Sequence, residues 1–291
     1  RNMADESSKI PEKTVEQIFD ERYPLDKWED SNYSILDKFS MRGRKGFVTG
    51  AAGGLGRNAA AALAQAGADV ALVDLPSQED KLTELAKDMS ERFGTNVIAL
   101  TCDVTNVEQV AELKTQLVEQ LGTVDFAFLN AGVNVPGDDQ DATEEVWTRT
   151  ININLNGTFT MMNAVYPHFK AAHAGTIVNV SSVAGKIGGG LLGTAAYASS
   201  KAGVNGLTKA VAKEGGKFGV RCNAVCPSLT LTDMTSILSD ENSQRIINGI
   251  PLGRAAQASE PAQMVLFFAS DLASFVNGEI GDCDGGIVLD G

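Results

Sequence analysis

The chain has 291 residues, of which 43% are hydrophobic and 21% charged, and its formal net charge is −13. This composition is typical of a globular protein with a sizeable core, and the negative charge excludes nonspecific nucleic-acid binding through a basic surface. No apolar run reaches the length of a membrane span, and the acidic N-terminus shows neither a signal-peptide nor a transit-peptide pattern, so a cytoplasmic setting without membrane partners is expected.

Cysteine and histidine usage gives no indication of a metal centre. The four cysteines, Cys102, Cys222, Cys226 and Cys283, form no C-x-x-C pair, and His168 and His173 lie far from them along the chain. We interpret the cysteines as reduced core thiols and the histidines as polar residues near a helix end. No metal site is therefore expected.

Residues 1–40 are expected to form a polar, acidic extension, and residues 41–291 one nucleotide-binding domain. Within the extension, Val15, Ile18 and Phe19 recur at helical spacing, which predicts a short amphipathic helix over 14–23. No internal repeat or linker divides the remainder of the chain.

A glycine-rich stretch follows the first expected strand, 45–49. It reads Thr49-Gly50-Ala51-Ala52-Gly53-Gly54-Leu55-Gly56 and leads into an Ala-rich helix over 57–66. Glycines allow a tight turn and a close approach of the backbone to a ligand, and a helix N-terminus favours negative charge. The stretch therefore predicts a cradle for a pyrophosphate.

Asp74 follows the next expected strand, 69–73, and lies 18 residues beyond Gly56. A carboxylate at this point can accept hydrogen bonds from a ribose 2′-hydroxyl and would repel a 2′-phosphate. Leu75 and Gly53, the neighbouring positions, offer no cation for such a phosphate. NAD is therefore predicted in preference to NADP.

Strands and helices alternate along the middle of the chain. Helices are expected over 78–93, 107–121, 143–172 and 197–218, and strands over 97–102, 124–129, 176–180 and 220–225. This rhythm predicts an α/β fold, a Rossmann-like doubly wound parallel sheet flanked by helices in a single domain, with ligands at the carboxyl ends of the strands. Asp103, Asn130, Ser182 and Pro227 fall at those ends.

Tyr197 and Lys201 lie four residues apart at the start of the helix expected over 197–218, and residues at this spacing share one helix face. A free tyrosine has a pKa of about 10, and a neighbouring cation lowers it. We therefore interpret Tyr197 as a proton-transfer group tuned by Lys201. A nearby serine hydroxyl, from the pair Ser181-Ser182, could hold the same substrate oxygen.

A series of short motifs runs through the chain in a fixed order. They are Thr49-Gly50-x-x-x-Gly54-x-Gly56, Cys102-Asp103-Val104, Asn130-Ala131-Gly132, Asn154-Leu155-x-Gly157-x-Phe159, Ser181-Ser182, Tyr197-x-x-x-Lys201, Asn223-Ala224-Val225-Cys226-Pro227, Pro251-Leu252-Gly253-Arg254 and Asp284-Gly285-Gly286. Each is weak alone, but the ordered set closely resembles the short-chain dehydrogenase/reductase family over roughly residues 40 to 291.

The resemblance implies a role for each matching residue. Tyr197 is similar to the family's general acid/base, Lys201 to the residue that lowers its pKa and binds the nicotinamide ribose, and Ser182 to the hydroxyl that orients the substrate. Asn154 resembles the asparagine that kinks the central helix and holds a relay water. The implied cofactor-binding residues are Gly50, Gly54, Leu55, Gly56, Asp74, Asp103, Val104, Asn130, Ala131, Gly132, Tyr197, Lys201, Pro227, Thr230 and Thr232. The resemblance also implies a homo-oligomer, a tetramer or a dimer.

The chain departs from the family pattern on the substrate side. Ser228 replaces the usual glycine after the proline, and the segment between Ser182 and Tyr197 is longer than usual, with glycines at 188–190. Residues 229–250 are expected to form a substrate lid, which contains no Arg or Lys before Arg245. A neutral secondary alcohol or ketone is therefore the predicted small-molecule substrate. The extension and the Leu36-x-x-Phe39-Ser40 entry to the domain resemble those of some sugar and polyol dehydrogenases, which implies a substrate of sugar or polyol type.

Other activities stay open. A hydroxysteroid dehydrogenase fits the same motifs, as does a 3-oxoacyl-thioester reductase, although Asp74 disfavours the latter because such reductases usually take NADP. A catalytically silent NAD-binding regulatory protein and a nonredox Rossmann enzyme, such as a methyltransferase, are alternatives from other classes. Tyr197 and Lys201, which neither would need, disfavour both.

Overall fold

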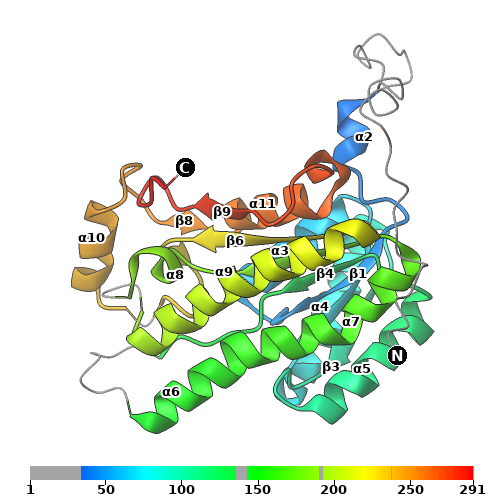
Figure 1. The fold of residues 1–291 in the computed structure, drawn as a ribbon, viewed down its shortest axis with the longest axis horizontal. Helices are drawn as coiled ribbons and strands as arrows, with labels where there is room; N and C mark the ends of the chain where they lie inside the picture. Colours follow the sequence, from blue (N-terminus) through cyan, green and yellow to red (C-terminus); the bar gives the residue numbers. More distant parts are fainter. Residues whose placement is uncertain (1–33, 136–142, 190–192, 237, 291) are drawn as a thin grey trace, which may run out of the picture. The chain divides into compact units, whose positions relative to one another are not determined.

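The central sheet consists of strands that are apolar on both faces. Seven parallel strands lie in the order β3-β2-β1-β4-β5-β6-β9, and helices cover both sides (Figure 1). The strands are β1 (Lys45–Thr49), β2 (Asp69–Asp74), β3 (Val97–Thr101), β4 (Phe126–Leu129), β5 (Gly175–Val180), β6 (Val220–Pro227) and β9 (Ile280–Cys283). Parallel strands are joined by helical crossovers that bury both faces of the sheet, so polar residues are few in them. The predicted doubly wound α/β fold is confirmed.

The computed structural model describes residues 34–135, 143–189, 193–236 and 238–290. Residues 39–291 group into one compact unit and residues 1–38 into another. The described helices are α2 (Ile35–Phe39), α3 (Gly54–Gln65), α4 (Glu79–Phe93), α5 (Val107–Leu121), α6 (Glu144–Ile151), α7 (Thr158–Ala172), α8 (Ala184–Ile187), α9 (Ala195–Gly215), α10 (Asp240–Asn248) and α11 (Ser259–Ala269). None of them has the length and apolar character needed to cross a bilayer. The helix predicted over 14–23 lies outside the described residues.

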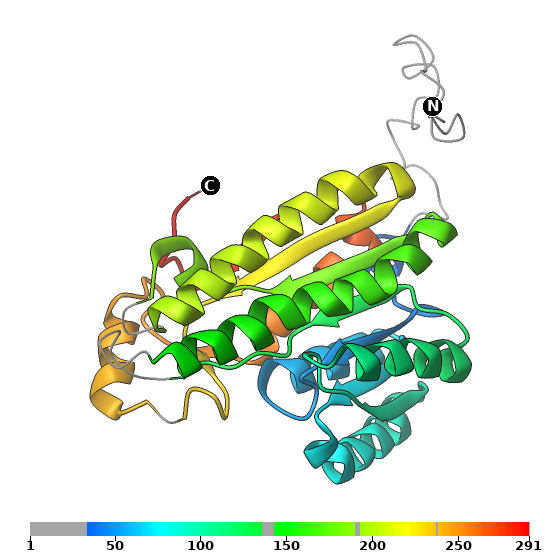
Figure 2. The same cartoon turned by 60° about the horizontal axis from the view of Figure 1, so that its bottom comes forward.

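Alternating side chains of the central strands pack into two main cores. Leu72 of β2 belongs to the core that includes Phe268 of α11, whereas the next residue, Val73, belongs to the core that includes Phe169 of α7. The first core lies under α3, α4 and α11, and the second under α5, α7 and α9, which run along one face of the sheet in Figures 1 and 2. This is the period of two expected of a strand that is buried on both sides.

The helix predicted over 143–172 is interrupted in the middle. A π-helical turn, Asn152–Gly157, separates α6 from α7. Such a turn inserts one extra residue into the helical repeat and often marks a functional site. The strand 45–49 and the helix 107–121 match their predicted bounds. The helix predicted from Arg57 begins earlier, at Gly54, so the glycine stretch itself forms the helix start.

The sheet order reverses direction between β1 and β4, which are hydrogen-bonded neighbours. Connections leave these two strands toward opposite edges of the sheet, and a crevice for ligands opens at their carboxyl ends. Gly50 follows β1 and Asn130 follows β4. Two of the predicted motifs are thereby brought to the same crevice.

All four cysteines carry free thiols. Cys102, Cys222 and Cys226 are buried, as predicted, whereas Cys283, at the end of β9, is only half-buried. Among the residues that the structure describes, no group of three or more His, Cys, Asp and Glu side chains could hold a metal ion.

Candidate active site

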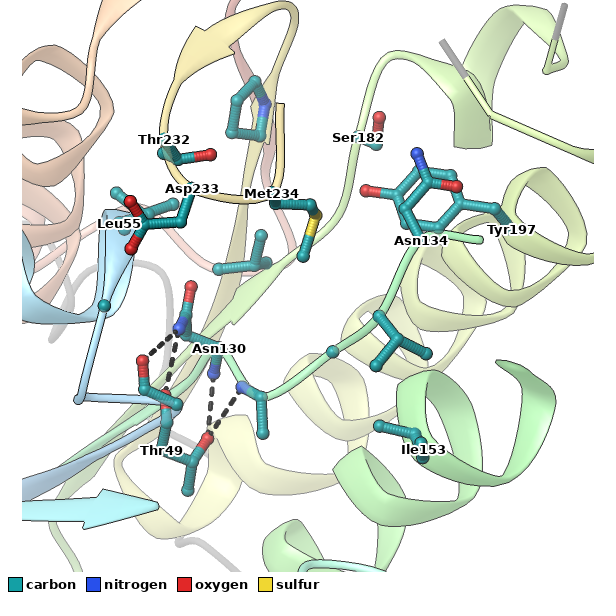
Figure 3. A pocket seen from close by; sticks show the side chains of 18 of the residues that line it. Thr49, Leu55, Asn130, Asn134, Ile153, Ser182, Tyr197, Thr232, Asp233 and Met234 are labelled. Carbon is teal, nitrogen blue, oxygen red and sulfur yellow. Dashed lines mark hydrogen bonds between the residues drawn. The ribbon is translucent and has the colours of Figure 1, made fainter. Parts of the chain in front are cut away.

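A pocket of about 600 Å³ lies at the carboxyl ends of the strands and collects most of the predicted site residues. In Figure 3, Leu55 and Thr232 lie on one side of it, and Ser182 and Tyr197 on the other. Asn130 and Thr49 lie below them, joined by hydrogen bonds. The pocket therefore extends from the glycine stretch to the predicted catalytic residues.

The glycine stretch forms an open cradle at the start of α3. Gly50 and Gly54 have φ angles of 66° and 50°, which favour glycine. A Cβ on Gly56 would overlap the carbonyl oxygen of Gly50, so only glycine lets α3 approach β1 this closely. Gly53, the N-cap residue of α3, provides no side-chain cap for the first amides of the helix. These features fit the pyrophosphate of a dinucleotide.

A hydrogen-bond network fixes the cradle to the end of β4. The Asn130 backbone amide donates to Thr49 Oγ1 at 3.0 Å, and its side-chain amide donates to the Thr49 and Gly50 carbonyl oxygens at 3.0 and 3.1 Å. The Ala131 amide donates to the same Thr49 hydroxyl at 3.1 Å. Thr49 therefore holds the two strand ends together, a role that its motif did not indicate.

Asp74 stands at the end of β2 beside the cradle. Its Oδ2 accepts a hydrogen bond from the Ala52 amide at 2.9 Å, and its Oδ1 accepts one from the Leu75 amide at 2.8 Å. A carboxylate oxygen can accept more than one hydrogen bond, so both oxygens retain capacity toward a ligand in the pocket. The carboxylate is thus held in place before any ligand binds.

The two adjacent serines after β5 differ in their hydrogen bonds. The Ser181 hydroxyl donates to the Lys201 carbonyl oxygen at 3.3 Å, and it is buried. The Ser182 oxygen accepts a hydrogen bond from the Ala184 amide at 3.2 Å, so its proton is available to another acceptor. This difference favours Ser182 as the hydroxyl that faces the pocket.

Lys201 is anchored beside Tyr197. Its Nζ donates to the Val180 carbonyl oxygen at 2.9 Å and lies 5.6 Å from the centroid of the Tyr197 ring. Lys201 is 4% exposed, whereas Tyr197 is half-buried. The ammonium is thus fixed to the end of β5.

Burial sets the protonation of both groups. It raises the pKa of Tyr197 to about 12, against a smaller lowering by the hydrogen bond with Ser182. It also lowers the pKa of Lys201 to about 8. The sequence predicted that Lys201 would lower the pKa of Tyr197. In the structure, desolvation of the phenol is the dominant effect on the pKa of Tyr197, and Lys201 is not among the groups that shift it.

Asn154 lies inside the π-helical turn and is fully buried. Its Oδ1 accepts from the Val133 amide at 2.8 Å, and its Nδ2 donates to the Val133 carbonyl oxygen at 2.9 Å. The same Nδ2 donates to the Ser200 hydroxyl at 3.1 Å. Asn154 therefore clamps the segment after β4 to α9, next to Lys201.

A loop after β6 lies over the glycine cradle. The Thr232 side chain lies 3.4 Å from the position that a Cβ on Gly54 would take, and Asp233 Oδ2 lies 3.4 Å from the same point on Gly53. In Figure 3 the Asp233 carboxylate is turned toward the start of α3 near Leu55. An acidic side chain thus lies where the cradle would receive an anion.

The structure shows the surroundings of Ser228, one of the two places where the chain departs from the family pattern on the substrate side. The Ser228 hydroxyl donates to the Asp284 carbonyl oxygen at 2.9 Å, so this serine is tied to the segment after β9. Part of the longer Ser182–Tyr197 segment, including the last of its three consecutive glycines, lies outside the described residues.

Most predicted site residues line the one pocket. These are Gly50, Gly54, Leu55, Asp74, Asp103, Val104, Asn130, Ala131, Gly132, Ser182, Tyr197, Lys201, Pro227, Thr230 and Thr232. Gly56 and Asn154 lie behind the wall, where they pack against Gly50 and hold Val133 respectively.

Further pocket residues escaped the sequence analysis as site residues. They include Asn134, Arg149, Ile153 and Asp233. Asn134 lies just beyond the Asn130-Ala131-Gly132 motif, and Ile153 immediately precedes Asn154, so proximity to a motif was the available signal. Nothing in the local pattern marked Arg149, on α6. Of the expected lid, Leu229, Met234, Leu238 and Ile246 line the pocket.

Known proteins with related sequences or structures cover nearly the whole of this domain. Residues 50–288 match a family model described as "Enoyl-(Acyl carrier protein) reductase". The chain is 37% identical to the 3-oxoacyl-[acyl-carrier-protein] reductase FabG of Thermotoga maritima, over 86% of this chain and 99% of that protein. It is 39% identical to the trans-4-hydroxycyclohexanecarboxylate dehydrogenase of Sinomonas cyclohexanicum, over 82% of this chain and 90% of that protein.

One solved structure is similar in fold and carries a ligand. It is a protein from Beutenbergia cavernae provisionally named as an NAD(P) dependent gluconate 5-dehydrogenase, with NADP bound at low occupancy. It superposes with a TM-score of 0.80 and 32% identity, over 86% of this chain and 98% of that chain.

Proposed function

This chain belongs to the short-chain dehydrogenase/reductase family, and we propose that it is an NAD(H)-dependent oxidoreductase that interconverts a secondary alcohol and a ketone. The observation that supports this most is the gathering of Ser182, Tyr197 and Lys201 at one end of a pocket whose other end is the glycine cradle. A protein that only bound a nucleotide would need the cradle but not these side chains.

The protein's own residues manage the proton and the substrate oxygen. When bound, the nicotinamide cofactor supplies or accepts the hydride. Because the pKa of Tyr197 is raised to about 12, its hydroxyl holds a proton at neutral pH and can donate it to a carbonyl oxygen during reduction. In oxidation the deprotonated form of the same oxygen takes the alcohol proton, and a rising pH increases the fraction of that form. Ser182 orients the substrate oxygen, and Asn154 and Lys201 complete the path of the proton to solvent.

The cofactor preference rests on Asp74. Its carboxylate is oriented by the Ala52 amide and lines the pocket next to the cradle. A ribose hydroxyl could donate to it, whereas a phosphate on that ribose would be repelled. The protein from Beutenbergia cavernae binds NADP on a similar fold, so the fold alone does not exclude NADP. The preference for NAD is therefore carried by this side chain.

The substrate is proposed to be a hydroxylated ring or chain of the sugar or polyol type. Leu229, Met234 and Ile153 give the pocket apolar walls, and polar groups are added by Ser182 and Tyr197. The names of two relatives, a gluconate 5-dehydrogenase and a hydroxycyclohexanecarboxylate dehydrogenase, describe hydroxylated substrates. A 3-oxoacyl-thioester reductase is the second candidate, because the Thermotoga maritima relative carries that name.

The test measures NADH formation at mildly alkaline pH with polyols, hydroxysteroids and 3-hydroxyacyl thioesters, each with NAD and with NADP. Tyr197→Phe is expected to lower kcat by about 10²–10⁴-fold, the typical contribution of a positioned acid or base, while NADH still binds. Tyr166→Phe, which alters a tyrosine packed against the second core outside the pocket, serves as the matched control.

Full activity in Tyr197→Phe would refute the mechanism. Tight binding of NADH by the wild type without turnover of any alcohol or ketone would favour the silent regulatory protein instead.

A further inference from the structure

A residue of the pocket wall carries a buried carboxamide oxygen that has no hydrogen-bond partner within the described chain. Asn134 follows the Asn130-Ala131-Gly132 motif and lines the pocket. Its Oδ1 is buried and accepts no hydrogen bond within the described chain. Buried carbonyl oxygens in native proteins are nearly always paired, and an unpaired one calls for an explanation. A ligand that supplies the missing donor is one such explanation.

Asn134 differs from the other buried polar atoms without a partner. In the described part of the chain these belong to Thr95, Asn134, Thr150, Asn179, Asn205 and Asp282. Of the six, only Asn134 lines the pocket. In Figure 3 its carboxamide is drawn over the Tyr197 ring, on the side of the pocket where Ser182 lies.

The backbone that carries Asn134 is fixed by the active site itself. Asn154 holds both the amide and the carbonyl oxygen of Val133, the preceding residue, at 2.8 and 2.9 Å. Two residues earlier, the position of a Cβ on Gly132 lies 3.6 Å from Lys201 Nζ and 3.2 Å from Asn154 Oδ1. The segment that ends in Asn134 is therefore clamped between the residues proposed to move the proton. An acceptor held in this way needs little further ordering to bind a ligand.

We propose that Asn134 is a substrate-binding residue that selects substrates with a second hydroxyl in addition to the one that reacts. Ser182 and Tyr197 hold the reacting oxygen, and the second hydroxyl donates to Asn134 Oδ1. The substrate class is then a diol and the corresponding hydroxyketone. A site built to bind a hydroxyl discriminates strongly against an analogue that lacks it, because the buried acceptor is left unpaired. This inference rests on the proposed alcohol–ketone activity and specifies its substrate.

The experiment compares two substrates that differ by one hydroxyl, cyclohexane-1,2-diol and cyclohexanol, with NAD. The wild type is expected to prefer the diol in kcat/KM. Asn134→Leu removes the acceptor at similar volume and leaves the second hydroxyl of the diol without a partner, which should lower kcat/KM for the diol by roughly 5- to 100-fold, with cyclohexanol nearly unaffected. Asn134→Asp retains an acceptor oxygen and should keep the preference. Asn205→Leu removes a buried amide outside the pocket and should change neither substrate.

Binding of the diol to the complex with NADH, followed by nicotinamide fluorescence, separates this inference from the proposed function. If the wild type turns over cyclohexanol and shows no preference for the diol, the inference about Asn134 is overturned and the proposed function is not. The same holds if Asn134→Leu lowers kcat/KM equally for both substrates. Diol binding that weakens in Asn134→Leu, without turnover in the wild type, would support the inference and contradict the proposed function. Neither binding nor turnover would overturn both.

Discussion

Two parts of the pocket are built in different ways. The strand-end wall, residues 49–56, 74 and 130–134, belongs to segments that directly follow the sheet strands. The overhanging segment, residues 228–250, follows β6 and contains the two-residue strand β7 (Thr230–Leu231) and the helix α10. Both contribute side chains to the same pocket.

The strand-end wall is held by hydrogen bonds between residues far apart in sequence. Asn130 is bonded to Thr49, 81 residues away, and Ala52 is bonded to Asp74, 22 residues away. The overhanging segment is bonded to distant residues near its start, where the Ser228 hydroxyl donates to the Asp284 carbonyl oxygen, 56 residues away. In the loop that follows β7, the bonds are local: the Thr235 hydroxyl donates to the Thr230 carbonyl oxygen and accepts from the Thr232 amide. Leu231 and Met234 are 54% and 44% exposed there. A segment with local bonds and exposed apolar side chains is easier to displace than the wall.

The difference indicates a division of roles. The strand-end wall has the shape for a cofactor before one binds, whereas the overhanging segment lies partly in the way of it, through Asp233. We therefore expect changes in the wall to have large effects on stability and binding, and changes in the overhang to have small effects confined to binding.

The largest expected effect on stability comes from Lys201, which is anchored to β5 beside the wall. Its pKa is lowered to about 8 by burial, against an unfolded value of about 10.4. The folded state therefore binds the Lys201 proton less well than the unfolded state does. The resulting decrease in the free energy of unfolding is complete below pH 8 and disappears as the pH rises toward 10.4. At pH 7 Lys201→Met should raise the free energy of unfolding by up to about 3 kcal/mol, from 1.36 kcal/mol per pKa unit, while it abolishes turnover.

Urea unfolding of wild type and Lys201→Met at pH 7 and pH 10 measures this effect. The increase in the free energy of unfolding of Lys201→Met over the wild type should be smaller at pH 10 than at pH 7. Lys209→Met, on the exposed side of the same helix, is the matched control and should show no such pH dependence. A variant less stable than the wild type at pH 7 would contradict the prediction.

A substitution at Gly56 tests how closely the glycine cradle of the wall is packed. Gly56→Ala places a Cβ against the Gly50 carbonyl oxygen, and the resulting overpacking should lower the free energy of unfolding by about 1–3 kcal/mol. NADH binding, followed by fluorescence, should be lost with it. Gly206→Ala is the matched control, because that glycine lies in α9 with nothing within 4 Å of the added Cβ. It should instead stabilise the protein by about 0.5–1 kcal/mol. Equal effects at both glycines would mean that the cradle is not close-packed.

The wall was also the part that the sequence predicted well. Its residues follow strands whose apolar pattern is clear, and a position at the end of a parallel strand fixes which side of the sheet a residue reaches. This pattern therefore places Asp74 and Asn130 at the crevice from sequence alone. The resemblance implied a kink at Asn154, but the apolar pattern alone predicted one continuous helix over 143–172, because the apolar spacing of α6 and α7 continues through the π-helical turn.

The overhanging segment was predicted only in outline. Its position depends on contacts such as Thr232 with Gly54, which join residues far apart in sequence and follow no periodic pattern. The unpaired oxygen of Asn134 was equally hidden, because a missing partner can be recognised only after folding. The raised pKa of Tyr197 was hidden for the same reason, since the sequence shows the nearby lysine but not the desolvation of the phenol.

Asp74 is expected to control the choice of cofactor with a moderate effect. Asp74→Asn can still accept from the Ala52 amide but loses the charge that repels a 2′-phosphate. We expect the Kd for NADPH to fall by about tenfold, equivalent to about 1.4 kcal/mol, and the Kd for NADH to rise. Asp69→Asn, at the other end of β2, is the matched control because its carboxylate also accepts a backbone amide, that of Asn96. An unchanged ratio of the two Kd values would refute the assignment.

The smallest expected effect is in the overhanging segment, at Asp233. Its carboxylate lies close to Gly53 at the start of α3, where a cofactor pyrophosphate would bind. Asp233→Asn removes the competing charge, and because an exposed charge near a helix N-terminus is worth about 0.3–1 kcal/mol, the Kd for NADH should fall by about two- to fivefold at low salt. The gain should shrink in 0.5 M NaCl, since salt screens exposed charges over roughly 10 Å or less. Asp240→Asn removes an exposed charge from the same segment outside the pocket and should leave the Kd unchanged. A higher Kd in Asp233→Asn would show that this carboxylate assists cofactor binding, and the overhang would then belong functionally with the wall.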